Sequence, residues 1–136
     1  MATVTFILGL CGAGKTWLAD RIVADAKFDE GFLREPVQHA GLIRALRSGQ
    51  NCVVVEIAYC YEAARQQIVQ EVTGAVPNVA VNWLCIENDL VKANKNCRER
   101  TNKRYPDEHV EINGRVSPMY TYPEGGVILR MWTREP

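Results

Sequence analysis

The eight residues GLCGAGKT, Gly9 to Thr16, place three glycines and a lysine directly after the apolar run Val4–Leu8. This run has the composition of a strand that is buried on both faces, as in a parallel sheet. The segment that follows the glycines, Lys15–Ala26, has apolar residues at helical spacing. A strand, a glycine-rich turn and a helix in this order predict an α/β fold whose first connection lies at the carboxyl edge of a parallel sheet.

The remainder of the chain alternates runs rich in β-forming residues with segments of helical spacing, separated by residues that favour turns. This order predicts a parallel sheet of about five strands, covered by helices on both faces. We expect strands at Thr3–Leu8, near Lys27–Phe28, and at Cys52–Ile57, Val79–Ile86 and Gly126–Met131. We expect helices at Lys15–Ala26, Pro36–Arg47 and Tyr61–Val72, from Asn88 or Asp89 to about Arg104, and from Pro106, with the turn-forming pair Asn113-Gly114 inside the last.

The glycine-rich segment fits the phosphate-loop template G-x-x-x-x-G-K-[ST] at every fixed position. Glycines let successive N–H groups converge on one phosphate, the lysine can reach the β- and γ-phosphates, and the hydroxyl can ligate Mg²⁺. An accidental glycine-rich turn is the alternative, and chance produces the four fixed positions in roughly one chain in a few hundred. The template favours a three-layer P-loop NTPase fold. The nucleotide-binding residues would be Gly9, Cys11, Gly12, Ala13, Gly14, Lys15 and Thr16, with Cys11 contributing only its backbone N–H.

A phosphate loop usually works with a carboxylate at the end of a neighbouring strand, which holds Mg²⁺. Glu56 closes the apolar run CVVVE and is the only residue of the chain that fits this position. The alternative for Glu56 is a strand-end carboxylate that faces solvent. Because an acidic group stands directly behind four apolar strand residues, the metal role is favoured, and the predicted magnesium site consists of Thr16 and Glu56.

The segment CRERTNKRYPDEHVE, Cys97–Glu111, places Arg100 and Arg104 four residues apart on one helical face. Arginines on a hinged helical element can close over a bound triphosphate and neutralise the charge that develops during transfer, whereas the alternative is a solvated charged face. Small GTPases need an N-K-x-D segment that reads guanine and a D-x-x-G segment. In Asn94-Lys95-Asn96-Cys97 a cysteine stands where the guanine-binding carboxylate belongs, and no D-x-x-G segment is present, so guanine specificity lacks support. ATP is therefore the expected nucleotide.

With these motifs the chain resembles the small phosphate-loop kinases of the polynucleotide-kinase and zeta-toxin type, a group that includes gluconate and chloramphenicol kinases. The resemblance covers nearly the whole chain and involves, in order, the segments GLCGAGKTWLADRI, LIRALRSGQNCVVVE, CRERTNKRYPDEHVEI and YPEGG. It implies a single P-loop kinase-like domain over residues 1–136. A small helical lid at about 97–116 would carry Arg100 and Arg104 at the lid-arginine positions.

The resemblance also implies how an acceptor is activated. In this group an aspartate after the second strand often activates the acceptor hydroxyl, and an arginine follows closely. FDEGFLR, Phe28–Arg34, resembles that segment, so Asp29 would be the base with Glu30 as its substitute, and Arg34 could hold an anionic part of the acceptor. A charged loop between two elements is the alternative. Glu56 stands where the group usually has aspartate, so either the metal or the base role is open to it.

The composition of the chain limits the classes of partner and the cellular compartment that we expect. Sixteen basic residues balance sixteen acidic ones, so no global field favours nucleic acid or an anionic membrane, and no apolar run reaches the ~18 residues of a membrane span. Five scattered cysteines without a C-x-x-C pair suit small buried hydrophobes in a reducing cytoplasm.

The sequence therefore predicts a cytoplasmic phosphotransferase that moves the γ-phosphate of Mg-ATP to a hydroxyl of a small molecule or nucleotide. A 5′-hydroxyl polynucleotide kinase and a non-catalytic ATP-binding module are the alternatives. The sequence leaves the acceptor and the oligomeric state open.

Overall fold

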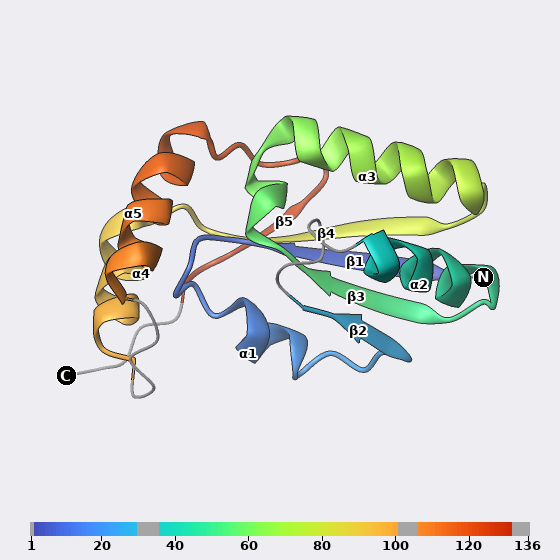
Figure 1. Cartoon of the computed structure of the whole chain (residues 1–136), viewed down its shortest axis with the longest axis horizontal. Helices are drawn as coiled ribbons and strands as arrows, with labels where there is room; N and C mark the ends of the chain where they lie inside the picture. The colour runs from blue at the N-terminus through green and yellow to red at the C-terminus, as the bar shows by residue number, and fades with distance from the viewer. Residues whose placement is uncertain (1, 30–35, 101–105, 132–136) are drawn as a thin grey trace.

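The structure, a computed structural model of the chain, describes residues 2–29, 36–100 and 106–131. Their centre is a five-stranded sheet in the order β2-β3-β1-β4-β5, and every neighbouring pair of strands is parallel (Figure 1). The strands are β1 (Thr3–Leu8), β2 (Ala26–Phe28), β3 (Asn51–Val55), β4 (Ala80–Ile86) and β5 (Val127–Leu129). The predicted parallel sheet of about five strands is thereby confirmed.

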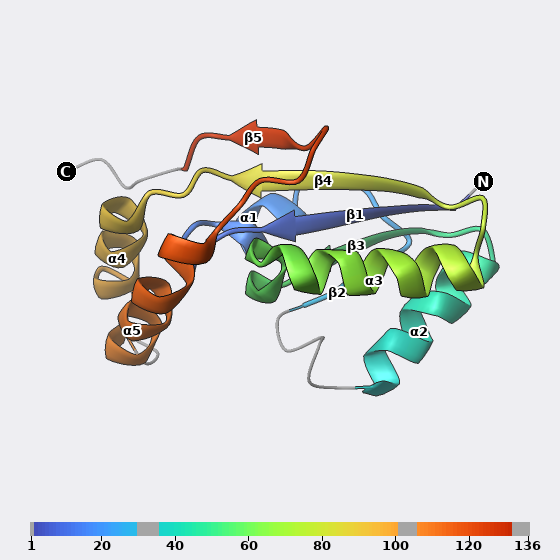
Figure 2. The ribbon, with the colours of Figure 1, turned by 90° about the horizontal axis from the view of Figure 1, so that it is seen from above.

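The helices lie in two unequal layers on the faces of the sheet and in a third group at one end. The α-helices are α1 (Lys15–Ala19), α2 (Pro36–Arg47), α3 (Glu62–Ala75), α4 (Leu90–Arg98) and α5 (Pro106–Val116), and the short 3₁₀ helices are η2 (Ile57–Cys60) and η3 (Ser117–Met119). Figure 2 shows α2 and α3 on one face, α1 on the other, and α4 with α5 beyond the end of the sheet. No helix within the described ranges has the length and apolar character needed to cross a bilayer.

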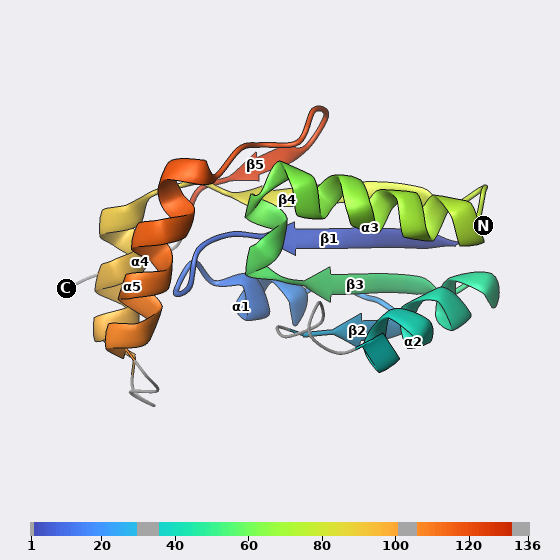
Figure 3. The same ribbon diagram turned by 45° about the horizontal axis from the view of Figure 1, so that its top comes forward.

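Every strand runs toward the end of the sheet where α4 and α5 lie. The arrowheads of β1 and β3 point at these helices in Figure 3, and the remaining strands are parallel to them. The carboxyl edge of the sheet is therefore the edge that faces α4 and α5. Ligands of open parallel sheets collect at this edge.

The helix expected at Lys15–Ala26 is wrong beyond Ala19, where α1 ends. The Asp25 N–H donates to the Asn51 carbonyl at 2.8 Å, and the Asp25 carboxylate accepts from the Asn51 N–H at 2.8 Å. These two hydrogen bonds fix the chain at the start of β2. Because that point lies at the edge of the sheet, the intervening backbone has to leave the helix early.

The helices at the carboxyl edge also differ from expectation. The Asp89 carboxylate caps α4 by accepting from the Lys92 N–H at 3.0 Å, and α4 ends at Arg98, well before Arg104. In contrast, α5 continues through the Asn113-Gly114 pair, where a turn was expected. The side chain of Asn113 is fully buried, so its polar groups have tertiary partners that replace the local ones of a turn.

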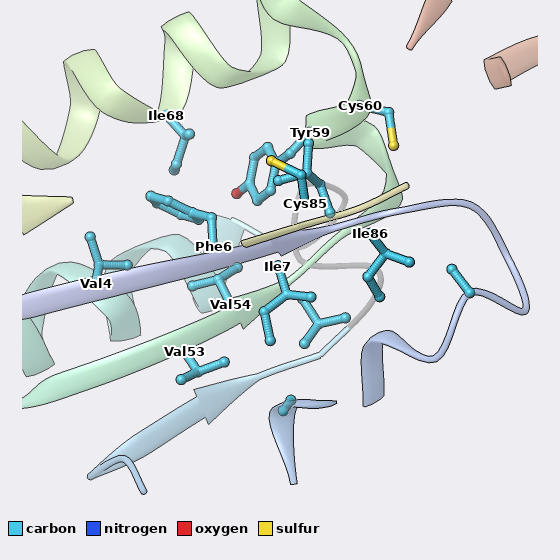
Figure 4. Packing of buried hydrophobic residues seen from close by; sticks show 14 of the residues in the cluster. Val4, Phe6, Ile7, Val53, Val54, Tyr59, Cys60, Ile68, Cys85 and Ile86 are labelled. Atoms are coloured by element: carbon cyan, nitrogen blue, oxygen red, sulfur yellow. The ribbon is translucent and has the colours of Figure 1, made fainter. Parts of the chain in front are cut away.

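The core lies mainly between the sheet and α3 (Figure 4). On this face the Phe6 ring stacks on Trp83 with centroids 4.7 Å apart and meets Tyr59 edge-on at 5.1 Å. Ile7 and Val53 point to the opposite face, toward α1 (Figure 4). The strand β1 therefore buries apolar side chains on both faces of the sheet. Fully burying one such side chain contributes about 1.5–3 kcal/mol to folding.

The helix α1 covers only part of its face of the sheet, because it is five residues long. The part beyond α1 has several polar residues, although Val53 is buried there beside Thr5. Thr3 and Thr5 of β1 alternate with buried Val4 and Phe6 and are half-buried. Their pairing partners in β3 and β4, Asn51 and Asn82, are exposed.

Candidate functional site

The glycine loop connects β1 to α1 at the carboxyl edge of the sheet. Gly12 has a φ of +82° and Gly14 a φ of +99°, in the left-handed region that residues with a side chain rarely adopt. The Ala13 N–H donates to the Leu10 carbonyl at 3.1 Å, and Gly14 is the N-cap of α1. Left-handed residues in such a tight turn are typical of concave loops that bind anions through their N–H groups.

The loop glycines are required for different reasons. A Cβ on Gly12 would lie 2.6 Å from the Ala93 carbonyl oxygen and 2.8 Å from the Cys97 sulfur, so this glycine lets α4 approach the loop. A Cβ on Gly14 would have no heavy atom within 4 Å. The open side of the loop is therefore the Gly14 side, and α4 occupies the Gly12 side.

Lys15 lies against its own loop. Its side chain is buried, and Nζ donates to the carbonyl oxygens of Gly9 at 2.8 Å and Leu10 at 2.9 Å. The ammonium is thus held beside the backbone that the sequence assigns to phosphate binding. A phosphate oxygen carries far more negative charge than a carbonyl and can replace these two acceptors.

The expected acidic residues follow neighbouring strands at the carboxyl edge. Glu56 follows β3, is buried, and accepts from the Ala58 N–H at 3.2 Å, which fixes the direction of its carboxylate. Its own N–H donates to the Ile7 carbonyl, beside the end of β1. Asp29 follows β2 and is exposed. Phe28 pairs with Val54 of β3, which places Asp29 at the same edge as Glu56 and one strand farther from the loop.

The oxygen donors at this edge suit Mg²⁺, which usually binds one or two protein oxygens together with substrate phosphates and water. Thr16 is exposed in the first turn of α1, and Glu56 follows the strand beside β1. The described residues contain no group of three or more His, Cys, Asp or Glu side chains arranged to hold a metal. A magnesium site in which substrate phosphates and water supply most ligands does not need such a group of protein side chains.

A cavity of about 550 Å³ opens beside the loop. Its walls come from three elements around the loop: Trp17 of α1, Asn96 and Arg100 at α4, and Arg130 after β5. Arg100 also donates from Nη1 to Nδ1 of His109 at 3.0 Å, which directs the guanidinium between α4 and α5. Arg104, Glu30 and Arg34 lie outside the described residues.

The loop has a contact that the sequence pattern missed. Asn113 of α5 accepts from the Cys11 N–H at 2.8 Å and donates to the Cys11 carbonyl at 3.0 Å. The Cys11 N–H, expected to face the nucleotide, therefore faces α5. Asn113 and Cys11 are 102 positions apart, so only the tertiary structure reveals the pair.

The cysteines around the loop are neutral packing groups. All five are free and buried, as their scattered positions predicted. Burial raises the pKa of the Cys60 thiol to about 12, although Lys15 and the Gly9 N–H act in the opposite direction. Burial likewise raises the pKa of Cys97, whose sulfur donates to the Cys11 carbonyl at 3.2 Å. Both thiols thus stay protonated near neutral pH.

No protein-family model matches the chain, and no curated protein matches it significantly. Several solved structures match it in fold. A gluconokinase from Sinorhizobium meliloti 1021 aligns with a TM-score of 0.62 at 14% identity, over 97% of this chain and 84% of that chain. The crystal structure of APE1195 aligns with a TM-score of 0.63 at 17% identity, over 96% and 84%. The chain therefore has a small P-loop kinase-like α/β fold, which confirms at the level of fold the resemblance stated from the sequence.

Proposed function

On the basis of this fold, we propose that the chain is an ATP-dependent phosphotransferase with a hydroxyl acceptor. The single observation that supports this most is the combination of Lys15 with the glycine loop. Two left-handed glycines shape the loop, and the lysine Nζ lies within 2.9 Å of two of its carbonyl oxygens. A positive charge beside a loop of this shape supports the proposal that a polyphosphate binds there.

The cavity beside the loop is the proposed site of the nucleoside. Its volume of about 550 Å³ lies within the range of small-ligand pockets. The Trp17 ring is half-exposed at its wall and carries the Arg21 guanidinium 3.5 Å from its centroid. An aromatic ring fixed in this way can pack against a base or a ribose. Arg100 and Arg130, on the same walls, give the cavity the charge that suits the phosphates next to it.

In the proposed transfer the oxygen of the acceptor hydroxyl attacks the γ-phosphorus, and the bond to the β–γ bridging oxygen breaks to release ADP. Lys15 would leave its two carbonyl acceptors and neutralise charge on the β- and γ-phosphates. Arg100 and Arg104 would do so from the proposed lid at about 97–116. The hydroxyl proton would pass to Asp29, with Glu30 and Glu56 as the other carboxylates proposed for this role.

The proposed Mg²⁺ ligands are the Thr16 hydroxyl and, through water, the Glu56 carboxylate. When bound, the ion would neutralise charge on the transferring phosphates. The Ala58 N–H that donates to the Glu56 carboxylate would keep this side chain turned toward the edge of the sheet.

The test is transfer of labelled γ-phosphate from ATP to a panel of acceptors. The panel contains sugar acids including gluconate, because one structural neighbour is a gluconokinase, together with other sugars, nucleosides and 5′-hydroxyl oligonucleotides. Lys15→Ala should lower transfer by about 10²–10³-fold, the usual effect of removing one donor to the developing charge. Lys95→Ala, which removes an exposed lysine on α4, is the matched control and should leave transfer unchanged.

Three outcomes separate the candidate functions. Labelling of oligonucleotides alone, with steep salt dependence of their binding, would assign a polynucleotide kinase. ATP that binds, stays intact and labels no acceptor would assign a non-catalytic ATP-binding module. Transfer that is equal in wild type and Lys15→Ala would refute the proposal.

A further inference from the structure

Asn113 lies in the second half of α5, and it is completely buried. Its Oδ1 accepts from the Cys11 N–H at 2.8 Å, and its Nδ2 donates to the Cys11 carbonyl at 3.0 Å. The two atoms of one side-chain amide thus pair with both polar groups of one backbone residue. Two facing residues of an antiparallel sheet exchange hydrogen bonds in the same way.

This pairing requires the two kinds of polar group that a side-chain amide carries. The Cys11 N–H can only donate and its carbonyl can only accept, so the partner must present one acceptor and one donor side by side. The second Nδ2 hydrogen goes to Oδ1 of Asn94 on α4, at 3.1 Å. Since the Asn94 oxygen accepts and cannot donate, it keeps the Asn113 amide in the orientation that Cys11 needs.

The same half of the loop has two further contacts with α4. Asn96 Nδ2 donates to the Gly12 carbonyl at 3.0 Å, and the Cys97 sulfur donates to the Cys11 carbonyl at 3.2 Å. Together with the close approach of Ala93 to Gly12, these contacts fix the backbone of residues 11 and 12. At Gly14, by contrast, a Cβ would meet no described residue within 4 Å.

We infer that Asn113 is a positioning residue, which sets the conformation of the phosphate loop from α5 and thereby the affinity for nucleotide. The inference rests on the proposed function for its effect on nucleotide affinity. Glycine-rich backbone has many accessible conformations, and the Asn113 amide removes most of those available to residue 11. The remaining N–H groups of the loop can then bind a phosphate without first being ordered.

The variant that tests this is Asn113→Asp. At neutral pH its carboxylate would face the Cys11 carbonyl without a proton to donate, and the repulsion between the two oxygens would push the side chain away from both polar groups of Cys11. The protonated carboxyl can both accept and donate, as asparagine does.

The groups that contact the side chain of residue 113 are the Cys11 peptide, the Asn94 amide and the neutral Cys97 thiol. Burial raises the pKa of the neighbouring Cys97 thiol and is the larger effect there, although the cations Arg100, Lys15 and Arg98 lower it. The cations would favour the charged form of the new carboxyl, and burial, as the larger effect, should raise its pKa above the usual range of aspartate.

The first measurement is hydrogen exchange of the Cys11 amide by NMR, on the ¹⁵N-labelled chain without nucleotide. In Asn113→Asp this exchange should be at least tenfold faster than in wild type at pH 7.5, after correction for intrinsic rates, and should approach wild type near pH 5. Asn82→Asp adds the same charge at an exposed position on β4 and should match wild type at both pH values. Equal Cys11 exchange in Asn113→Asp and wild type would overturn the inference, whether or not the chain binds ATP.

The second measurement is the dissociation constant of Mg-ATP by calorimetry, expressed at each pH as the ratio to wild type. This ratio should be about 10 or more for Asn113→Asp at pH 7.5 and fall toward 1 as the pH is lowered. If Asn113 had a purely structural role, Asn113→Asp would lower the melting temperature, but the ratio of dissociation constants measured on the folded protein would stay at 1. This result would also overturn the inference. Absence of nucleotide binding by wild type would refute the proposed function, and the exchange measurement would still decide the role of Asn113.

Asn94 offers a second pair of variants in case Asn113→Asp does not fold. Asn94 is only half-buried, so its replacement should be tolerated. Asn94→Ala removes the oxygen that orients the Asn113 amide and should speed Cys11 exchange severalfold. Asn94→Asp keeps an acceptor oxygen and should restore protection. Equal exchange in these two variants would contradict the orienting role.

Discussion

Gly12 has two structural reasons for lacking a side chain. Its φ of +82° is strained for other residues, and a Cβ would meet the Ala93 carbonyl oxygen at 2.6 Å. Gly14 has the first reason without the second, because its φ is +99° and a Cβ there would have open space. The two positions of one loop therefore separate backbone strain from steric overlap.

We expect Gly12→Ala to lower the free energy of unfolding by about 3–4 kcal/mol, which combines left-handed strain of 1–2 kcal/mol with the overlap against α4. Gly14→Ala should lower it by about 1–2 kcal/mol, from strain alone. Urea denaturation of both variants would measure the difference. Equal losses would show that α4 can move away from the loop at little cost.

The fixed positions of the loop could be predicted from the sequence because they are neighbours along the chain. Lys15 and Thr16 follow from the template, and the structure places them at the start of α1. Asn113 could not be predicted, because its partner is 102 positions away and the Asn113-Gly114 pair is locally typical of a turn. Trp17 and Arg130 were missed for the same reason, since the cavity that joins them forms only when α1 and β5 are placed.

At the scale of elements, some limits could be predicted to the residue and others could not. The helix α2 spans Pro36–Arg47 as expected, whereas the strand β5 spans only Val127–Leu129 of the expected Gly126–Met131. The run Thr3–Leu8 is β1 residue for residue, because residues that favour strands fill it and Gly9 follows directly. In contrast, α1 ends seven residues before its expected limit at Ala26, where the chain has already joined β2. Periodicity describes which face a helix would bury, but the position of the next strand decides where the helix stops.

The short α1 alters how an anion would be held. A helix of five residues aligns few peptide dipoles, and the field at its N-terminus is correspondingly weak. The loop N–H groups and Lys15 would therefore provide most of the attraction for phosphate. This is a different balance from the one that a twelve-residue helix would give.

One carboxylate joins the last strand to α4. Glu87 Oε1 accepts from the Met131 N–H at 3.0 Å and from Lys92 Nζ at 3.2 Å. The Met131 N–H, followed by Lys92, holds the pKa of Glu87 below its ordinary value of 4.5. The folded chain therefore binds this proton less readily than the unfolded chain. The resulting stabilisation is complete above about pH 4.5 and is lost as the pH falls through the lower pKa of the folded state.

We expect Glu87→Gln to lower the free energy of unfolding by about 0.5–1 kcal/mol at pH 7, because the pair is partly exposed. The difference from wild type should shrink as the pH falls below about 4.5 and disappear once wild-type Glu87 is protonated. Denaturation curves at several pH values measure this, with Glu111→Gln, on the exposed side of α5, as the control. A loss that stayed constant with pH would mean that the charge of Glu87 is unimportant.

At the scale of the whole molecule, nucleotide binding should couple to global stability. A ligand at a hundred times its dissociation constant adds about 2.7 kcal/mol to the free energy of unfolding. For a domain of this size the melting temperature should rise on the order of 10 °C. Differential scanning calorimetry with Mg-ATP should show the rise in wild type and in Lys95→Ala, and none in Lys15→Ala. A rise that survives in Lys15→Ala would place the nucleotide somewhere other than the glycine loop.

The fold as a whole could be predicted from the sequence, because alternating strands and helices allow few arrangements of a parallel sheet. Helical cover on both faces was also expected. Among the described residues, no helix covers the part of the α1 face around Thr5 and Asn82. Polar residues at alternate positions of β1 could have indicated this, because a doubly covered strand has no need of them.

Those threonines and asparagines have a consequence for how small such a protein can be. Water can hydrate these polar side chains directly. This part of the sheet therefore does not form the exposed apolar patch that removal of a covering helix ordinarily leaves. To shorten an enzyme of this architecture by deleting a covering helix, a designer would accordingly also have to place a polar residue at every second position of the strands that the helix had covered.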